Sequence, residues 1–359
     1  MLQSLIQLAA WLALPVMLIC IVDDWFLRPR RVAAAGDEAV EGVLLKVLYG
    51  LLPLLILAAV YRMLTAERAD FSLLLVVITL VSGLVWTVDA LLLRPRREAV
   101  FLAAGRDPAA FADPGTVDYA RSFFPVAVVL LVLRSFLFEP YRIPSDSMMP
   151  TLLDGDFIVV NKYAYGLRLP VSNHKFLTVG APERGDVVVF RYPPDPQVNY
   201  IKRVVGLPGD LVQVRGDRLI INGEPVPFRE LGRYSDGCYL NMRLAAEKLG
   251  EHEHQVLHCL TPDGIVVPRL SSCDRDIPQG YICNEAFGDG VADSGDVVLQ
   301  VPEGRYLMVG DNRDNSQDGR WWGFVDEKLL VGKATRIWFN WDLQRSGGPA
   351  WSRIGNRIQ

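Results

Sequence analysis

Two serines, Ser145 and Ser147, stand close together in a segment that reads Pro-Ser-Asp-Ser-Met-Met-Pro-Thr from Pro144 to Thr151. Proline fixes φ and disfavours helix at the residue before it, so we expect this segment to be stiff and extended or turn-like. It follows an apolar stretch that ends at Phe138, which predicts that the Ser147 hydroxyl lies close to a membrane surface. A hydroxyl held there has either an interfacial packing role or a chemical one, as a nucleophile.

Lys202 is a candidate base for such a serine. It lies in an apolar stretch whose period of two puts Tyr200 and Lys202 on one face of a strand and Ile201 and Arg203 on the other. Burial disfavours the ammonium form and lowers the pKa of a lysine. A lysine lowered in this way can take a proton from a serine at neutral pH. The alternative is an ordinary strand lysine that pairs with a carboxylate.

A third polar segment, Gly310–Arg320, directly follows an apolar strand candidate. Asp314, Ser316 and Asp318 mimic the first half of a calcium-binding EF-hand loop, but the twelfth position is Val325, where that loop needs a glutamate. The preferred interpretation is a turn with internal hydrogen bonds that presents hydroxyl and carboxylate groups to a site.

The four histidines provide no base for a serine–histidine–aspartate triad, since none is close in sequence to Ser147 or to the third segment. His252, His254, His258 and Cys259 suggest zinc, but no second cluster stands at zinc-finger spacing. No glycine-rich phosphate loop is present either. We therefore expect no metal and no cofactor.

Apolar residues are concentrated in the first 140 positions, and a membrane-spanning helix needs about 20 of them in a row. The four candidate spans are Leu2–Val22, Val43–Leu64, Phe71–Leu93 and Phe123–Phe138. Arginine-rich loops at 23–42 and 94–122 are predicted to be cytoplasmic, which puts everything after 138 outside. Four helices of a soluble bundle are the alternative. Two of the apolar spans end with Leu-Arg-Pro-Arg-Arg, at 27–31 and 93–97, which indicates either a duplicated helix unit or two similar membrane boundaries.

From residue 150 onward, short β-branched runs alternate with glycine, proline and aspartate, which is typical of an all-β domain of barrel or sandwich type. Asn222-Gly223 predicts a tight hairpin turn. The predicted strands are 157–162, 186–192, 200–205, 211–214, 218–221, 297–301, 306–309 and 334–339. The net charge of -4 gives no basic excess, so nucleic acid is not an expected partner.

Residues 229–296 look like an insert in this domain, with Met242–Leu249 as its best helix candidate. The insert holds Cys238, Cys259, Cys273 and Cys283. An even set of cysteines outside the membrane suggests disulfides, and sequential pairing closes the smallest loops of the three possible arrangements.

Together, the three polar segments resemble bacterial type I signal peptidase, a membrane-bound serine protease that releases exported proteins from their signal peptides. Pro144–Leu152 resembles its nucleophile motif, Gly185–Pro193 a strand motif, Tyr200–Asp210 its lysine motif and Gly310–Val325 its last motif. The resemblance runs from Leu91 to Trp341, so the first two apolar segments fall outside it.

The resemblance implies a role for each matching residue. Ser147 is the expected nucleophile, Lys202 the general base, and Ser316 a hydrogen-bond partner that orients the lysine. The Ser145 hydroxyl and the Ser147 N–H are the expected oxyanion donors. Asp318 and Arg320 are expected to brace the site as an ion pair. The expected lining of the pockets for small substrate side chains is Ile143, Pro144, Met148, Leu152, Tyr200 and Ile201.

These pockets imply cleavage of exported preproteins after Ala-x-Ala sites, at the periplasmic side of the bacterial inner membrane. The expected domains are a helix pair at 1–70, a second pair with its basic loop at 71–140, the catalytic β domain at 141–345 and a tail at 346–359. Besides preproteins and the lipid bilayer, the export channel is a candidate partner for the first pair. The alternative function is a membrane protein without enzymatic activity that uses an outer β domain for binding or sensing.

Two positions depart from the family pattern. Asp146 adds a carboxylate beside the nucleophile and is expected to point to solvent. Gly319 stands where a serine is common, which is expected to loosen the turn that holds Asp318 and Arg320.

Overall fold

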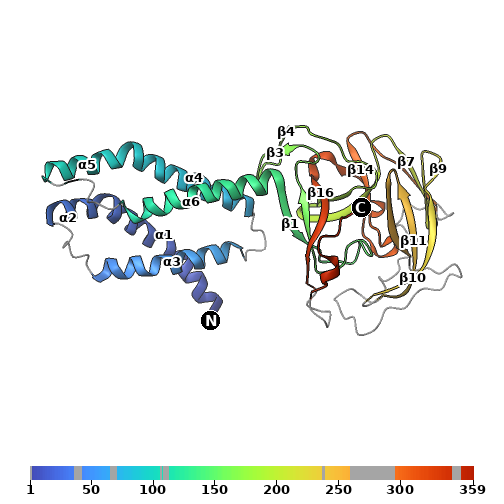
Figure 1. Ribbon diagram of the computed structural model, residues 1–359, viewed down its shortest axis with the longest axis horizontal. Helices are drawn as coiled ribbons and strands as arrows, with labels where there is room; N and C mark the ends of the chain where they lie inside the picture. Colours follow the sequence, from blue (N-terminus) through green and yellow to red (C-terminus); the bar gives the residue numbers. More distant parts are fainter. Residues whose placement is uncertain are drawn as a thin grey trace. The chain divides into compact units, whose positions relative to one another are not determined.

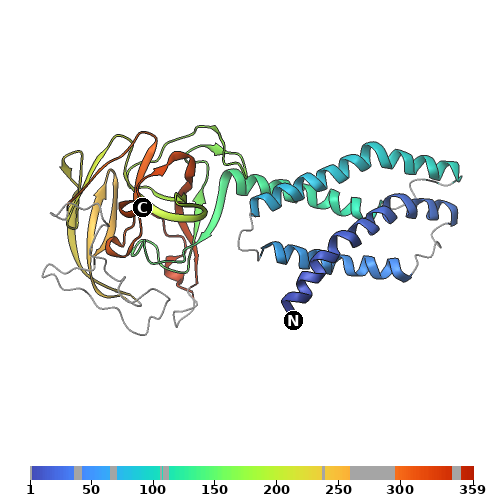
Figure 2. The same ribbon diagram turned by 180° about the vertical axis from the view of Figure 1, so that it is seen from behind.

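The computed structural model describes residues 2–35, 43–64, 71–105, 107, 113–236, 239–258, 296–341 and 349–359. The chain divides into a helical unit, Met1–Arg134, and a mainly β unit, Ser135–Gln359 (Figures 1 and 2).

The helical unit contains two helix pairs, in which α1 packs on α3 and α4 packs on α6 (Figure 1). Prolines interrupt the interior of α1, α3 and α6, which membrane helices tolerate. The helices are α1 (Leu2–Val22), α2 (Arg28–Ala35), α3 (Val43–Leu64), α4 (Phe71–Val88), α5 (Arg94–Ala103) and α6 (Gly115–Val132).

The similarity between the two basic loops extends to structure. A π-helical turn joins α1 to α2 at Asp23–Leu27, and another joins α4 to α5 at Asp89–Leu93. In each π-helical turn the first aspartate pairs with an arginine eight residues later, Asp23 with Arg31 and Asp89 with Arg97. This repetition favours duplication over two unrelated membrane boundaries.

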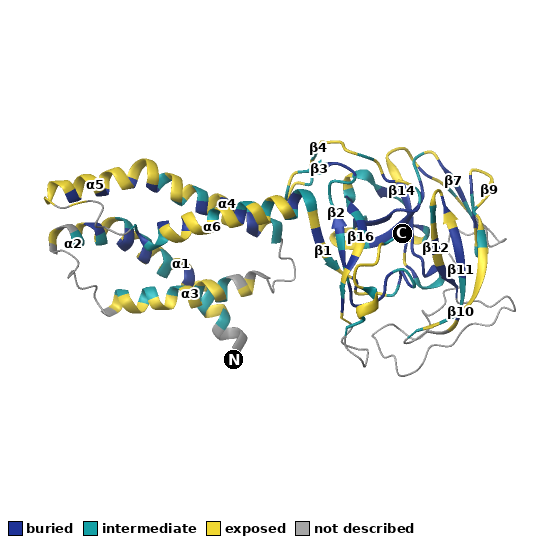
Figure 3. Ribbon diagram, viewed as in Figure 1, coloured by how far each residue is buried: buried dark blue, intermediate teal, exposed yellow. Residues whose placement is uncertain are grey.

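Three helices are long and apolar enough to cross a membrane, and they cover Ile6–Val32, Phe71–Ala103 and Gly115–Leu137. The second predicted span does form helix α3, but its apolar stretch in the described residues, Leu44–Ala59, is shorter. Figure 3 shows that these helices are exposed along much of their length, as lipid-facing helices are in the absence of a bilayer. The four-span count therefore stays a prediction, whereas three helices of spanning length are observed in the described part of the chain.

The β unit is built on one sheet of seven antiparallel strands. Its strands are, in spatial order, β1 (Phe138–Arg142), β2 (Asp156–Asn161), β16 (Leu330–Asn340), β5 (Val187–Tyr192), β6 (Asp195–Gly206), β14 (Arg305–Val309) and β15 (Val325–Asp326).

Three smaller sheets complete the unit. The first holds β13 (Asp296–Gln300), β7 (Leu211–Arg215), β8 (Arg218–Ile221) and β9 (Glu224–Pro225); the second holds β10 (Phe228–Asp236), β11 (Tyr239–Leu249) and β12 (His252–His258); the third holds β3 (Leu167–Arg168) and β4 (Lys175–Leu177).

Every strand that the sequence predicted overlaps an observed strand. The turn at Asn222-Gly223 has positive φ at both residues, as the predicted hairpin requires.

The helix predicted at Met242–Leu249 is wrong, because this stretch is the central strand β11. Its Ala-Ala-Glu-Lys-Leu run favours helix locally, but β10 and β12 hydrogen-bond to it on both edges. Tertiary pairing therefore overrides a weak local preference. Cys238, Cys259, Cys273 and Cys283 lie outside the described residues, so their pairing stays a prediction.

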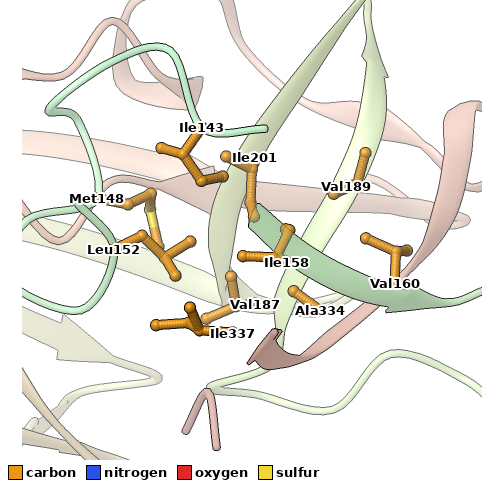
Figure 4. Close-up of a cluster of buried hydrophobic side chains, with 10 residues drawn as sticks. All are labelled: Ile143, Met148, Leu152, Ile158, Val160, Val187, Val189, Ile201, Ala334 and Ile337. Carbon is orange, nitrogen blue, oxygen red and sulfur yellow. The ribbon is translucent and has the colours of Figure 1, made fainter. Parts of the chain in front are cut away.

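The hydrophobic core nearest to the serine segment joins β2, β5, β6 and β16 (Figure 4). Residues 349–359, within the predicted tail, pack onto the same region, because Arg353 bonds Asp156 and the Thr151 carbonyl, and Ile358 contacts the core.

Candidate active site

The serine segment forms the connection from β1 to β2, and Ser147 in it is 9% exposed. Met148 and Leu152 are fully buried in the core, so the loop is fastened just beyond the serine. The Ile143 N–H donates to the Asp156 carbonyl (2.8 Å), which fastens the other end. The Ser147 hydroxyl is thereby held at a fixed position on a loop, as a nucleophile requires.

Lys202 on β6 reaches this hydroxyl, with Nζ 2.5 Å from Ser147 Oγ. It is 4% exposed, and burial lowers its pKa to about 8, although Asp318 and Asp311 partly oppose the shift. Nζ also lies 5.6 Å from the centre of the Tyr200 ring, on the strand face that the alternation predicted. A lysine in this state can act as a base on the serine.

The Ser145 hydroxyl lies 3.4 Å from that of Ser147, and Ser145 itself is exposed. The structure therefore brings together Ser145, Ser147 and Lys202 from two segments that are 55 residues apart. Asp146 between the serines is half-buried, and its backbone carbonyl accepts a hydrogen bond from the Asn312 side chain (3.0 Å).

Asp318 is completely buried and accepts hydrogen bonds from the Gly310 N–H (2.9 Å) and from Arg320 Nε (2.8 Å). Burial alone would raise the pKa of Asp318, but the Arg320 guanidinium holds it below its usual range. The predicted ion pair is therefore present. A Cβ at Gly319 would lie 2.8 Å from Leu307 Cδ1 on β14, so β14 fills the space that a larger side chain at this position would need.

Ser316 is buried near the nucleophile, but its hydroxyl makes no hydrogen bond to Lys202 in the described part of the chain. A Cβ on Gly310 would overlap the Ser316 hydroxyl and would lie 2.6 Å from the Ser147 carbonyl oxygen. Glycine at 310 thus allows the last motif to approach the serine loop closely.

Sequence reasoning missed the groups that join these segments. The Asn312 N–H donates to the Ser147 carbonyl (3.1 Å), and Arg203 forms a buried pair with Asp311, with Nε 2.7 Å from Oδ1. Thr151 donates to the same carboxylate (2.6 Å). Arg203 carried a usable signal, because a charged side chain in an otherwise apolar strand needs a partner where that strand is buried.

The predicted pocket residues separate into two groups. Ile143, Met148, Leu152 and Ile201 all lie in one buried cluster (Figure 4). Pro144 is exposed, and Tyr200 is half-buried, stacked on Tyr192 with ring centres 4.3 Å apart. Four of the six thus contribute to the packing beneath the serine.

A buried lysine bonded to a serine hydroxyl, in a β unit that follows apolar helices, is the arrangement of a membrane-anchored serine hydrolase. The family model of signal peptidases of the S26 peptidase family matches residues 116–339. The chain belongs to this family and is an endopeptidase that is anchored in a membrane.

Curated relatives agree with this assignment. Signal peptidase I of Pseudomonas fluorescens is 43% identical over 307 residues, which covers 80% of this chain and 98% of that protein. Signal peptidase I of Pseudomonas aeruginosa is 42% identical over the same length and with the same coverage. A solved signal peptidase I from Enterococcus faecalis shares 25% identity and covers 44% of this chain and 98% of its own, with a TM-score of 0.23 that is too low to bear on the fold.

Proposed function

We propose that this chain removes signal peptides from exported preproteins with Ser147 as nucleophile and Lys202 as general base. The observation that carries the proposal is the 2.5 Å contact between Lys202 Nζ and Ser147 Oγ in a buried setting. Because burial lowers the pKa of Lys202 to about 8, a substantial fraction of the lysine is neutral near physiological pH.

The reaction follows from this geometry. The neutral lysine takes the hydroxyl proton as Ser147 Oγ attacks the scissile carbonyl. The Ser145 hydroxyl and the Ser147 N–H stabilise the oxyanion, each worth about 3–4 kcal/mol in other acyl-transfer enzymes. The lysine then gives its proton to the leaving amine, and water, activated by the same lysine, hydrolyses the acyl-enzyme.

Supporting roles belong to the last motif. Asp318 and Arg320 keep Gly310–Arg320 folded against the serine loop. Ser316, buried without a bond to Lys202 here, is proposed to orient the lysine when substrate is bound.

The remaining expectations are proposals about the surroundings. Substrates have small residues in an Ala-x-Ala pattern, and the β unit lies on the periplasmic side of the inner membrane. Ile143, Pro144, Met148, Leu152, Tyr200 and Ile201 shape the pockets, four of them from within the core. The export channel is a candidate partner of the first helix pair, the β unit closes as a barrel or sandwich, and the cysteines of the insert pair sequentially.

The test uses the full chain in membranes or detergent and a preprotein with an Ala-x-Ala site. Ser147→Ala and Lys202→Ala are each expected to lower kcat by about 10³-fold or more, because a nucleophile and its base act as a unit and removal of either one abolishes their joint contribution. The matched controls Ser172→Ala and Lys328→Ala, both on the surface, are expected to cleave like the wild type. Continued processing by both active-site variants would refute the catalytic roles of Ser147 and Lys202, whereas a wild-type chain that cleaves no preprotein would favour a binding or sensing protein. Cleavage of only one preprotein among several unrelated ones would indicate a protease with a dedicated substrate.

A further inference from the structure

Strands β11 and β12, which lie in the sequence between Lys202 and the last motif, carry buried polar side chains that contact residues 311–313 of that motif. Glu247 on β11 is 1% exposed and binds Arg313 of the last motif through both carboxylate oxygens, with Arg313 Nη1 3.0 Å from Oε1. Burial alone would raise the pKa of Glu247, but the Arg313 guanidinium holds it far below its usual range. A bidentate, fully desolvated pair fixes both distance and orientation.

His254 on the neighbouring strand β12 lies between this pair and a second one, Arg203 with Asp311. Its Nε2 lies 3.4 Å from Glu247 Oε2 and 3.8 Å from Asp311 Oδ1. Burial lowers the pKa of His254, with the nearby Arg203 guanidinium adding to the effect, so the imidazole is neutral near pH 7. Neither ring nitrogen makes a hydrogen bond within the described residues, and Nε2 is the nitrogen that lies between the two carboxylates.

The segment that these groups hold, 311–313, is in direct contact with the serine loop. The Asn312 backbone N–H donates to the Ser147 carbonyl (3.1 Å), and the Asn312 side-chain amide donates to the Asp146 carbonyl (3.0 Å). The Arg313 carbonyl accepts a hydrogen bond from Arg320, the partner of Asp318. The position of Arg313 therefore affects both the backbone of the nucleophile and the ion pair beside Lys202.

A backbone contact reinforces the link, because the Leu257 N–H of β12 donates to the Asp311 carbonyl (2.9 Å). The buried side chains also balance one another in charge. Two carboxylates, Glu247 and Asp311, face two guanidiniums, Arg203 and Arg313, around a neutral histidine. Removing one carboxylate leaves a buried cation without a partner, and the loop that carries it must shift or take in water.

We propose that Glu247 and His254 are positioning residues for peptide-bond cleavage, which set the place of the 311–313 segment and through it that of Ser147. Neither touches the reacting atoms. This inference rests on the proposed roles of Ser147 and Lys202.

The experiment measures kcat and KM for preprotein cleavage by the full chain carrying Glu247→Gln, which removes the charge and keeps the shape. We expect kcat to fall by about tenfold to a hundredfold, because displacing a reacting group by about 1 Å costs that much. KM should stay within about threefold, since substrate does not contact the pair. Glu247→Asp, which keeps the charge, should recover part of the lost kcat.

Glu253→Gln on the adjacent strand is the matched control, since its carboxylate is exposed and, among the residues that the structure describes, pairs with the exposed Arg229. All rates are taken well below the unfolding midpoint of each variant, which is measured on the same sample. A Glu247→Gln protein that is folded and cleaves with the kcat of the Glu253→Gln control would overturn the proposal.

His254→Gln provides a second route should Glu247→Gln not fold, with His174→Gln as the exposed histidine control. We expect kcat to fall by about threefold to tenfold with KM unchanged, and an unchanged kcat would reject the role of His254. Ser147→Ala is run in parallel: if it cleaves, the proposed nucleophile fails, whereas a Glu247 effect that is absent while Ser147→Ala is inactive rejects only the positioning role.

Discussion

At the residue scale, the chemistry depends on how strongly the protein disfavours a charged Lys202. Lowering its pKa from 10.5 to about 8 costs the ammonium form about 3 kcal/mol relative to the neutral amine. Burial is the largest cause, and two nearby carboxylates limit it. The balance leaves a base that is strong enough to take the serine proton and is still partly deprotonated near neutral pH.

This balance predicts the pH dependence of cleavage. Since only neutral Lys202 accepts a proton, kcat/KM should rise with pH and level off above the pKa of about 8. Two pH units below the inflection, the rate should be roughly a hundredfold lower. The measurement is kcat/KM for one preprotein between about pH 5.5 and 9.5. A profile that is flat below pH 8 would mean that a different group is the base.

At the element scale, the site forms where three segments meet at one sheet: the serine loop, strand β6 and the last motif. β6 supplies both Lys202 and Arg203, whose side chains leave the strand on opposite faces. The first faces the serine, and the second holds Asp311 at the start of the last motif. One strand therefore fixes the base and, through its other face, the loop that touches the nucleophile.

Asp311→Asn should accordingly destabilise the β unit. The change leaves the Arg203 guanidinium buried without its counter-charge, and breaking such a pair costs about 3–5 kcal/mol. Asp326→Asn is the control, because its pair with Lys328 is exposed and such pairs contribute about 0–1 kcal/mol. Denaturant unfolding of the full chain followed by tryptophan fluorescence checks both variants, and equal losses of stability would contradict the assigned role of the buried pair.

At the scale of the whole molecule, the helical unit contains an additional helix pair beside the one that leads into the β unit. The Asp24 carboxylate accepts from the N–H (3.0 Å) and hydroxyl (2.9 Å) of Thr116 at the start of α6, so the first pair contacts the second within this unit. The repeated pairing of aspartate with arginine supports a duplicated membrane element.

The four-span topology predicts that a reporter fused after Ala66 is exposed on the outer side. The reason is that α1 and α3 must both cross for the arginine-rich 23–42 loop to remain inside. The measurement is the activity of a reporter that works only outside, compared with the same reporter fused within 94–122, which should be inactive. A silent Ala66 fusion would overturn the four-span topology, whatever the second fusion shows.

The sequence alone determined the chemical inventory of this protein. The resemblance of its polar motifs to those of signal peptidases implied roles for Ser147, Lys202, Asp318 and Arg320, and each motif could be recognised because its residues are neighbours in the sequence. The apolar helices and most strands could be predicted because their hydrophobic periodicity depends on residues that are close in the sequence.

Only the tertiary structure decided which of these residues contact one another. It turned Met242–Leu249 into a strand, because two neighbouring strands supply hydrogen bonds that outweigh a local helix preference. It placed Ile143 and Met148 in the core, paired Arg203 with Asp311, and brought Glu247 against Arg313. Such contacts join residues tens of positions apart, and the burial that gives them their strength exists only once the chain has folded.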